Sequence, residues 1–197
     1  MEEIATTKTA EKYNFFCKQP SDINEHLPVL ANLAVECDHI TEMGVRAVVS
    51  TWALLLGRPE VLRCYDIHKN ENIEEAIVEA QANFIDMKFI EADVLKVEIE
   101  ETDMLFIDTL HQYTQLKNEL KLHSKKVKKY LVFHDVETYG TKGEPAEWQT
   151  PEIMENYVKD DKGIMYAITE FLAENKEWAV KAHYKNNNGL LVLEKNG

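Results

Sequence analysis

The sequence alternates between short apolar runs and amphipathic stretches, and this alternation limits the possible folds more than any other feature. Apolar runs typical of strands lie at residues 40–45, 61–67, 88–92, 104–107 and 130–133. Stretches with apolar residues at helical spacing lie at residues 22–38, 50–57, 71–84 and 114–126, and a long helical region after residue 151 ends at residue 174. Alternating strands and helices predict a mainly parallel sheet with helices on both faces.

The C-terminal part departs from this alternation. Apolar runs at residues 178–184 and 190–193 are joined by Asn-Asn-Asn-Gly at 186–189. Asn-Gly between two such runs predicts a β-hairpin, which adds one antiparallel strand to the sheet. We expect residues 21–197 to form a single domain and residues 1–20 to be an N-terminal extension.

Composition excludes several classes of protein. The chain of 197 residues carries 22 basic and 35 acidic residues, a formal charge of −13. So acidic a surface repels phosphate backbones and anionic lipids, so neither nucleic acid nor a membrane is an expected partner. Three scattered cysteines without a C-x-x-C pair, and an N-terminus without an apolar leader, favour a cytoplasmic protein. The sequence does not indicate the oligomeric state.

The loop after the first strand has a single glycine. Glu42 and Gly44 close the strand, and a helix is expected from Ser50. A pyrophosphate would need further glycines, but Val48 and Val49 occupy that region. A dinucleotide is therefore disfavoured, whereas a ligand without phosphate needs no such cradle. Gly44 can equally be a simple turn at the end of a strand.

Acids follow the second and third strands. Asp66 ends the second strand 22 positions after Gly44, the spacing at which an acid holds ribose hydroxyls. Asp93 follows the third strand, where it can accept from an adenine amino group while Val94 stacks on the ring. Either acid can alternatively cap a helix or lie in a solvated loop.

The fourth and fifth strands each end in an Asp with a His nearby. Asp108 and His111 follow the fourth strand, and His134 and Asp135 follow the fifth. If the strands are neighbours, these side chains can share one ligand. Two carboxylates and an imidazole suit Mg²⁺ or Mn²⁺. Neutral imidazole is also a suitable general base near pH 7.

These motifs together resemble a known family. The run 42–54, EMGVRAVVSTWAL, is similar to the opening motif of class I S-adenosylmethionine-dependent methyltransferases. The runs 107–113, IDTLHQY, and 133–135, FHD, resemble the small-molecule O-methyltransferases related to cephalosporin hydroxylase and macrocin O-methyltransferase. The resemblance implies a Rossmann-like fold with a seven-stranded sheet in the order 3-2-1-4-5-7-6, the seventh strand antiparallel.

The resemblance also implies roles for the residues singled out above. The cofactor would be S-adenosylmethionine, and the acceptor a sugar or another small hydroxylated molecule. The cofactor would contact Glu42, Gly44, Ser50, Thr51, Asp66, Asp93 and Val94. Asp108 and Asp135 would face the acceptor, directly or through Mg²⁺ or Mn²⁺. His111 or His134 would be the general base, and Asp108 would belong to the same catalytic group.

The sequence departs from the family pattern at two places. The first loop lacks the family's glycines, and Leu110 replaces the second acid of the fourth-strand motif, which leaves a metal site one ligand short. Two alternatives therefore remain. One is a non-catalytic protein that keeps this fold and binds the cofactor or a partner. The other is a nucleotide- or NAD-binding Rossmann enzyme.

Overall fold

Seven strands form one sheet in the order β3-β2-β1-β4-β5-β7-β6. The computed structural model describes residues 7–148, 150–151, 153–159 and 161–196. The strands are β1 (His39–Met43), β2 (Val61–Asp66), β3 (Asp86–Glu91), β4 (Thr102–Ile107), β5 (Val127–His134), β6 (Trp178–Tyr184) and β7 (Leu190–Lys195). Neighbouring strands are parallel from β3 to β5, and β7 is antiparallel to both β5 and β6. The expected seven-stranded order and its antiparallel strand are confirmed.

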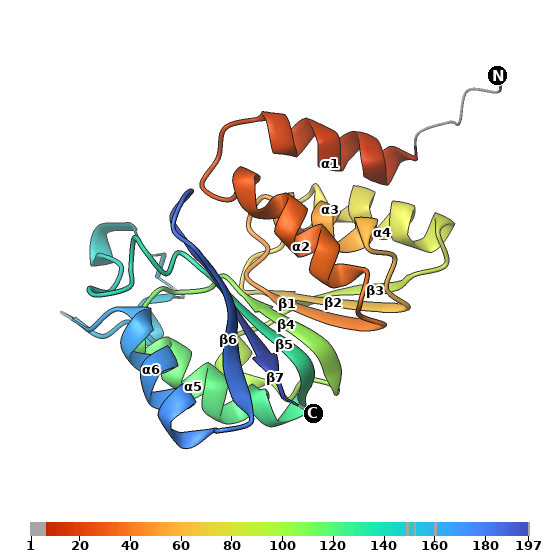
Figure 1. Cartoon of the computed structure of the whole chain (residues 1–197). Coiled ribbons are helices and arrows are strands. Elements are labelled where there is room, and N and C mark those ends of the chain that lie inside the picture. The colour runs from red at the N-terminus through yellow and green to blue at the C-terminus, as the bar shows by residue number, and fades with distance from the viewer. Residues whose placement is uncertain (1–6, 149, 152, 160, 197) are drawn as a thin grey trace.

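Helices cover both faces of the sheet (Figure 1). One side carries α1 (Lys8–Lys18), α2 (Leu27–Ala34), α3 (Val49–Leu56) and α4 (Ile73–Ala82), and the other carries α5 (Tyr113–His123) and α6 (Ile164–Glu174). Single 3₁₀ turns are η1 (Asn24–His26), η2 (Val94–Lys96), η3 (Ser124–Lys126), η4 (Ala146–Trp148) and η5 (Ile153–Glu155). Helix α1 lies outside α3 and α4, where Lys8 and Lys12 pair with Glu75.

The two cores follow the alternation of side chains along the strands. In β4, Met104 and Phe106 pack in the core under α2, α3 and α4. Leu105 and Ile107 pack in the other core, against α5 and α6. Every residue of β4 is buried, as expected for a strand covered on both faces. This central strand is therefore fixed in register, and so is the residue that follows it.

Helix α1 was not predicted, because residues 1–20 were expected only as an extension, and two predicted helices have other bounds in the structure. The expected helix at 22–38 is the η1 turn followed by α2, because Pro28 lies in the first turn of α2 and starts a new helix there. The helical region expected after residue 151 begins only at Ile164. Between β5 and α6, the described residues 135–148, 150–151, 153–159 and 161–163 form an irregular connection with two 3₁₀ turns, and its prolines and glycines disfavour a helix. We call it the β5–α6 connection.

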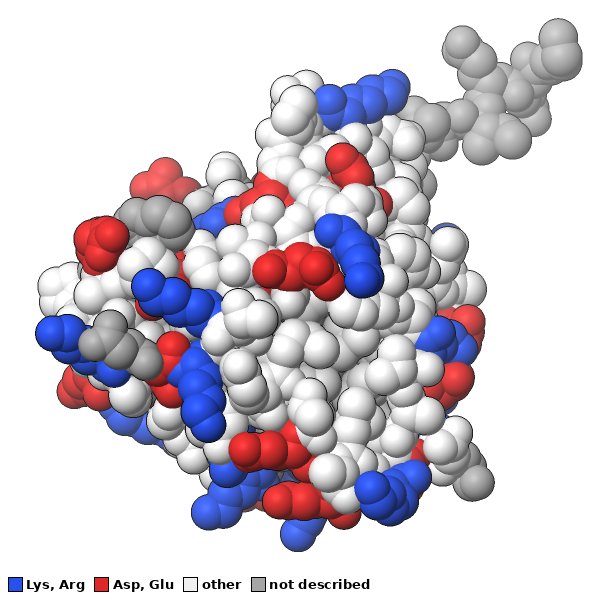
Figure 2. Space-filling model, turned by 60° about the vertical axis from the view of Figure 1, so that its left-hand side comes forward, with Lys and Arg blue, Asp and Glu red and all other residues white. Residues whose placement is uncertain are grey.

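Acidic and basic side chains are interspersed on the face of the molecule shown in Figure 2. In the part of the chain that the structure describes, no helix combines the length and apolar character needed to cross a bilayer.

Candidate functional site

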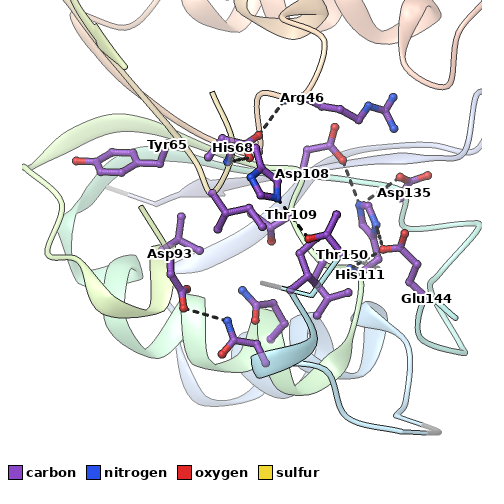
Figure 3. A pocket seen from close by; sticks show the side chains of 18 of the residues that line it. Arg46, Tyr65, His68, Asp93, Asp108, Thr109, His111, Asp135, Glu144 and Thr150 are labelled. Carbon is purple, nitrogen blue, oxygen red and sulfur yellow. Dashed lines mark hydrogen bonds and ion pairs between the residues drawn. The ribbon is translucent and has the colours of Figure 1, made fainter. Parts of the chain in front are cut away.

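A cavity of about 720 Å³ lies along the carboxyl ends of the parallel strands. Residues that follow each of these strands line it: Gly44 and Arg46 after β1, Asp66 at the end of β2, Asp93 after β3, Asp108 after β4 and Asp135 after β5. This edge of an open α/β sheet is where ligands bind. Figure 3 shows the labelled members of this set around the cavity.

Segments distant in sequence complete the cavity wall. They contribute Asp22, Tyr139, Glu144, Thr150, Ile153, Asn156 and Asn188. The first segment is held by the β6–β7 turn, because the Asn187 side chain accepts from the backbone N–H of Glu25 and donates to the carbonyl of Ser21. None of the seven was predicted individually as a site residue, although Tyr139, Glu144 and Thr150 belong to the polar stretch 137–151 that was expected to shape acceptor specificity. All seven lie in turns and irregular connections, where no periodic pattern indicates which residues face a cavity.

His111 lies among three carboxylates. Its Nε2 is 3.1 Å from Asp108 Oδ1 and 3.2 Å from Asp135 Oδ2, and its Nδ1 is 3.0 Å from Glu144 Oε2. Figure 3 shows the three acids pointing toward the imidazole. The ring of Tyr139 stacks on His111 with centroids 5.1 Å apart. Asp108, His111 and Asp135 lie close together, as predicted from the sequence. The third acid, Glu144, comes from the β5–α6 connection.

These carboxylates hold His111 in its charged form. Burial favours the neutral imidazole, but the hydrogen bonds with Asp108 and Glu144 and the nearby charge of Asp135 raise the pKa of His111 to about 10. Burial also disfavours ionisation of Asp108, yet the two histidines outweigh it, and the pKa of Asp108 lies well below its usual range. These contacts favour the charged imidazole over the neutral form that was expected near pH 7.

His134 does not line the main cavity. Its side chain is buried, with Nδ1 3.2 Å from Asp108 Oδ1 and Nε2 3.1 Å from the carbonyl oxygen of Asp22. Despite burial, Asp108 and Asp135 raise the pKa of His134 to about 10. Because His134 lies outside the main cavity, a role as general base toward an acceptor in that cavity does not fit. His134 instead orients Asp108 and holds the Asp22 segment.

Three of these side chains can hold a divalent cation. One potential ligand atom each from Asp108, His111 and Asp135 lies within 4.8 Å of the others. Oδ1 of Asp135 is buried without a hydrogen-bond partner among the described residues, so this oxygen is available to a ligand. Two carboxylates and an imidazole fit Mg²⁺ or Mn²⁺.

Glu42, Ser50 and Thr51 lie beneath the cavity and do not line it. The Glu42 carboxylate is fully buried and accepts from the hydroxyl of Ser50 at 2.6 Å and that of Thr51 at 2.8 Å. Burial raises the pKa of Glu42 to about 7, although these hydrogen bonds and one from the Cys64 thiol act in the opposite direction. Direct contact of these three residues with a cofactor is therefore not supported. They connect β1 to α3 under the first loop.

The first loop has a left-handed backbone at alternate positions. Gly44 (φ 86°), Arg46 (φ 42°) and Val48 (φ 65°) all have positive φ. A Cβ on Gly44 would lie 1.9 Å from the carbonyl oxygen of Asp108, so β4 itself requires a glycine there. Arg46 and Val48 adopt the same backbone region although neither is a glycine. This conformation is strained for Val48, because its side chain is β-branched.

Asp66 fixes this loop. Its Oδ2 accepts from the backbone N–H groups of Val45 at 2.8 Å and Arg46 at 2.9 Å, and its Oδ1 accepts from that of His68 at 3.0 Å. Asp66 therefore lies where the spacing placed it, at the tip of β2 and in the cavity wall. A carboxylate has about four acceptor positions, so little capacity is left for ribose hydroxyls without a shift of the loop.

Asp93 and Val94 line the other end of the cavity, beside β3. Asp93 caps η2 through the backbone N–H of Leu95 at 2.9 Å and accepts from the side-chain amide of Asn156 at 3.1 Å. The β5–α6 connection thus reaches across to this end, where Thr150 also lies 3.4 Å from the ring of His68 (Figure 3). Asp93 therefore caps a helical turn, as the alternative interpretation expected, and it also lines the cavity.

No protein-family model matches this sequence, and no curated protein matches it either. Solved structures do match. An O-methyltransferase from Bacillus cereus in complex with SAH is 15% identical with a TM-score of 0.61, over 99% of this chain and 94% of that one. The N-methyltransferase NodS from Bradyrhizobium japonicum, in complex with S-adenosyl-L-homocysteine, is 15% identical with a TM-score of 0.61, over 95% of this chain and 98% of that one.

A third match is the SAH-bound methyltransferase PaMTH1 from Podospora anserina, 15% identical with a TM-score of 0.56, over 96% of this chain and 88% of that one. At such identities the likeness concerns the fold. Because enzymes that methylate oxygen and nitrogen both match over nearly the whole chain, the fold leaves the acceptor atom open. The chain therefore has the Rossmann-like fold of these methyltransferases.

Proposed function

We propose that this protein is an S-adenosylmethionine-dependent methyltransferase that methylates a hydroxyl group of a small molecule. The observation that carries the proposal is the cavity, which runs along five parallel strand ends in the order of the sheet. Asp93 and Val94 lie at the β3 end, Asp66 at β2, and the acid–imidazole cluster at β4 and β5. A long cofactor fits along this edge, with its reactive end directed toward the cluster.

In this arrangement Asp93 and Val94 would contact the adenine, and Asp66 the ribose. The loop at Gly44 would contact the amino-acid end. Asp108 and Asp135 would face the acceptor. Oδ1 of Asp135, which has no partner among the described residues, is suited to accept a hydrogen bond from the acceptor hydroxyl. Aligning that oxygen with the methyl carbon supplies much of the rate enhancement in such a displacement.

The proton of the hydroxyl must also be removed. His111 can accept it only after losing the proton that its three acids stabilise. Asp108, His111 and Asp135 would hold Mg²⁺ or Mn²⁺, and a bound cation would lower the pKa of the acceptor hydroxyl. Glu144 and Tyr139 would keep the His111 ring in position, through the 3.0 Å contact and the stacked ring.

Calorimetry with S-adenosylmethionine and with S-adenosyl-L-homocysteine tests the cofactor. We expect binding of both and no competition by NAD at millimolar concentration, because Val48 is buried in the core where a pyrophosphate cradle would need a glycine. Displacement by NAD, or no binding of either methionine-derived ligand, would overturn the proposal.

Transfer of a labelled methyl group to a panel of sugars and other hydroxylated molecules tests the reaction. We expect Mg²⁺ or Mn²⁺ to stimulate transfer and EDTA to suppress it. Cofactor binding without transfer to any acceptor would favour the non-catalytic alternative.

A further inference from the structure

Arg46 and Asp22 form an ion pair in the cavity wall, between Nη2 and Oδ2. Arg46 belongs to the first loop, and Asp22 to the segment that precedes α2. Among the cavity-lining residues the arginine and lysine side chains are Arg46 and Lys69, whereas six are acidic: Asp22, Asp66, Asp93, Asp108, Asp135 and Glu144. Of these two cations, Arg46 is the one that follows β1.

The backbone fixes both members of the pair. The N–H of Arg46 donates to Asp66, and its φ of 42° sets the direction of the side chain. The carbonyl of Asp22 accepts from His134 Nε2 at 3.1 Å. Arg46 nevertheless keeps 75% of its side chain exposed, and Asp22 keeps 30%, so a ligand can reach both charges. The charges are thus held in place and remain accessible.

We propose that Arg46 and Asp22 bind the zwitterionic amino-acid end of the cofactor, the guanidinium taking the α-carboxylate and the Asp22 carboxylate taking the α-ammonium. This inference rests on the proposed function. If adenine lies at β3 and ribose at β2, the amino-acid end lies over β1, beside Arg46. A zwitterion carries the same two charges as the pair, so each side chain exchanges its present partner for a ligand group of equal charge.

The assignment gives a physical reason for an arginine in a left-handed position. A glycine there would adopt the backbone at lower cost but would bring no charge. Binding by backbone N–H groups is also restricted in this loop, since those of Val45 and Arg46 already donate to Asp66. The side-chain pair supplies the recognition that these backbone groups do not.

The test compares two ligands by calorimetry: S-adenosyl-L-homocysteine, and 5′-methylthioadenosine, which lacks the amino-acid end. The variants are Arg46→Gln and Asp22→Asn. The control is Lys69→Gln, which removes one positive charge at the β2 side of the same cavity. The quantity of interest is the ratio of the two affinities in each protein. Partial loss of folded protein affects both ligands alike and cancels in this ratio.

We expect each of the two variants to lower the affinity for S-adenosyl-L-homocysteine about tenfold, the scale of a charge-assisted hydrogen bond near solvent. Binding of 5′-methylthioadenosine should change less than twofold, and the Lys69→Gln ratio should equal that of the wild type. An unchanged ratio in Arg46→Gln and Asp22→Asn would overturn the inference and leave the proposed function standing. An equal loss of affinity for both ligands would also overturn the inference, because it would mean that the pair only supports the loop. If the wild type binds neither ligand, the proposed function fails and this inference fails with it.

Discussion

The Nε2 atom of His111 lies 3.1 Å from Oδ1 of Asp108, in a contact between two residues of the fourth-strand motif that are three positions apart. The pKa values of the two groups move in opposite directions, that of His111 upward and that of Asp108 downward. In the ligand-free protein the imidazolium therefore neutralises part of the acid cluster. Any cation that binds between the acids has to displace this proton.

Mn²⁺ binding should accordingly strengthen with pH. We expect the apparent affinity to rise by up to about tenfold per pH unit between pH 6 and 9, with release of protons on binding. Calorimetry in buffers of different ionisation enthalpy measures both quantities. Asp108→Asn and Asp135→Asn should abolish Mn²⁺ binding while leaving S-adenosylmethionine binding largely intact. The control is Glu98→Gln, which changes an exposed acid paired with Lys126. Mn²⁺ affinity that is independent of pH, or retained in Asp135→Asn, would rule out this site.

Asp66→Ala should affect both the fold and the cofactor. The backbone N–H groups of Val45 and Arg46 lose their acceptor, so we expect a loss of about 1–3 kcal/mol in the free energy of unfolding without ligand. S-adenosylmethionine binding should weaken by about 1.5–3 kcal/mol. Urea denaturation and calorimetry give the two values. Unchanged affinity in a folded variant would remove the ribose role, and unchanged stability would contradict the loop contacts.

The stability of the protein should fall as pH rises through the window set by Glu42. Its pKa is about 7 in the folded protein and 4.5 in the unfolded chain. Between these values the unfolded chain releases a proton that the folded protein retains, so unfolding becomes easier by roughly 3 kcal/mol. Glu42→Gln removes this dependence, and its stability relative to the wild type should increase from pH 4.5 to pH 7.5. Glu101→Gln, at an exposed position before β4, should leave the pH dependence as it is. Parallel pH profiles for Glu42→Gln and the wild type would refute the assignment.

Phe84→Gly should stabilise the protein. Phe84 follows α4 with φ 60° and is 94% exposed. The N–H of Ile85 donates to the carbonyl of Ala80 and that of Phe84 to the carbonyl of Gln81, a helix end that favours glycine. We expect a gain of about 1 kcal/mol, measured by urea denaturation. The same change at the half-exposed Phe15, inside α1, should destabilise the protein. A loss of stability in Phe84→Gly would show that the ring contributes more than the backbone strain costs.

The sequence pattern was sufficient to predict the strands and the acids at their tips, and the family resemblance supplied the strand order. Carboxyl ends of parallel strands share one edge, so Asp66, Asp108 and Asp135 could be placed from their distance to apolar runs alone. The failure at Glu42 has a simple cause. Side chains alternate along a strand, and Glu42 shares the face of Ile40, which packs under α3. Reading the strand's period would have placed this acid beneath the loop.

The protonation of the site could not be predicted in the same way. It depends on Glu144, which reaches His111 through a connection without periodic pattern. Asp22 and Asn188 likewise lie in turns, and their positions in the cavity wall depend on the path of the whole chain. The connection was also where a helix was expected too early, so both failures concern the same segment.

The contact between Asn187 and the backbone of Glu25 has a consequence for the order of folding. It spans 162 positions, and β7 must also enter between β5 and β6. During synthesis the strands from β1 to β4, which carry the proposed cofactor end, leave the ribosome well before residues 186–195. The acceptor end can be completed only when this last hairpin docks and traps the early segment around Asp22. We therefore expect the nascent chain to bury its first strands early and to leave the β5 edge exposed to other chains until the hairpin arrives. Hydrogen exchange during refolding would then show the β7 amides protected last.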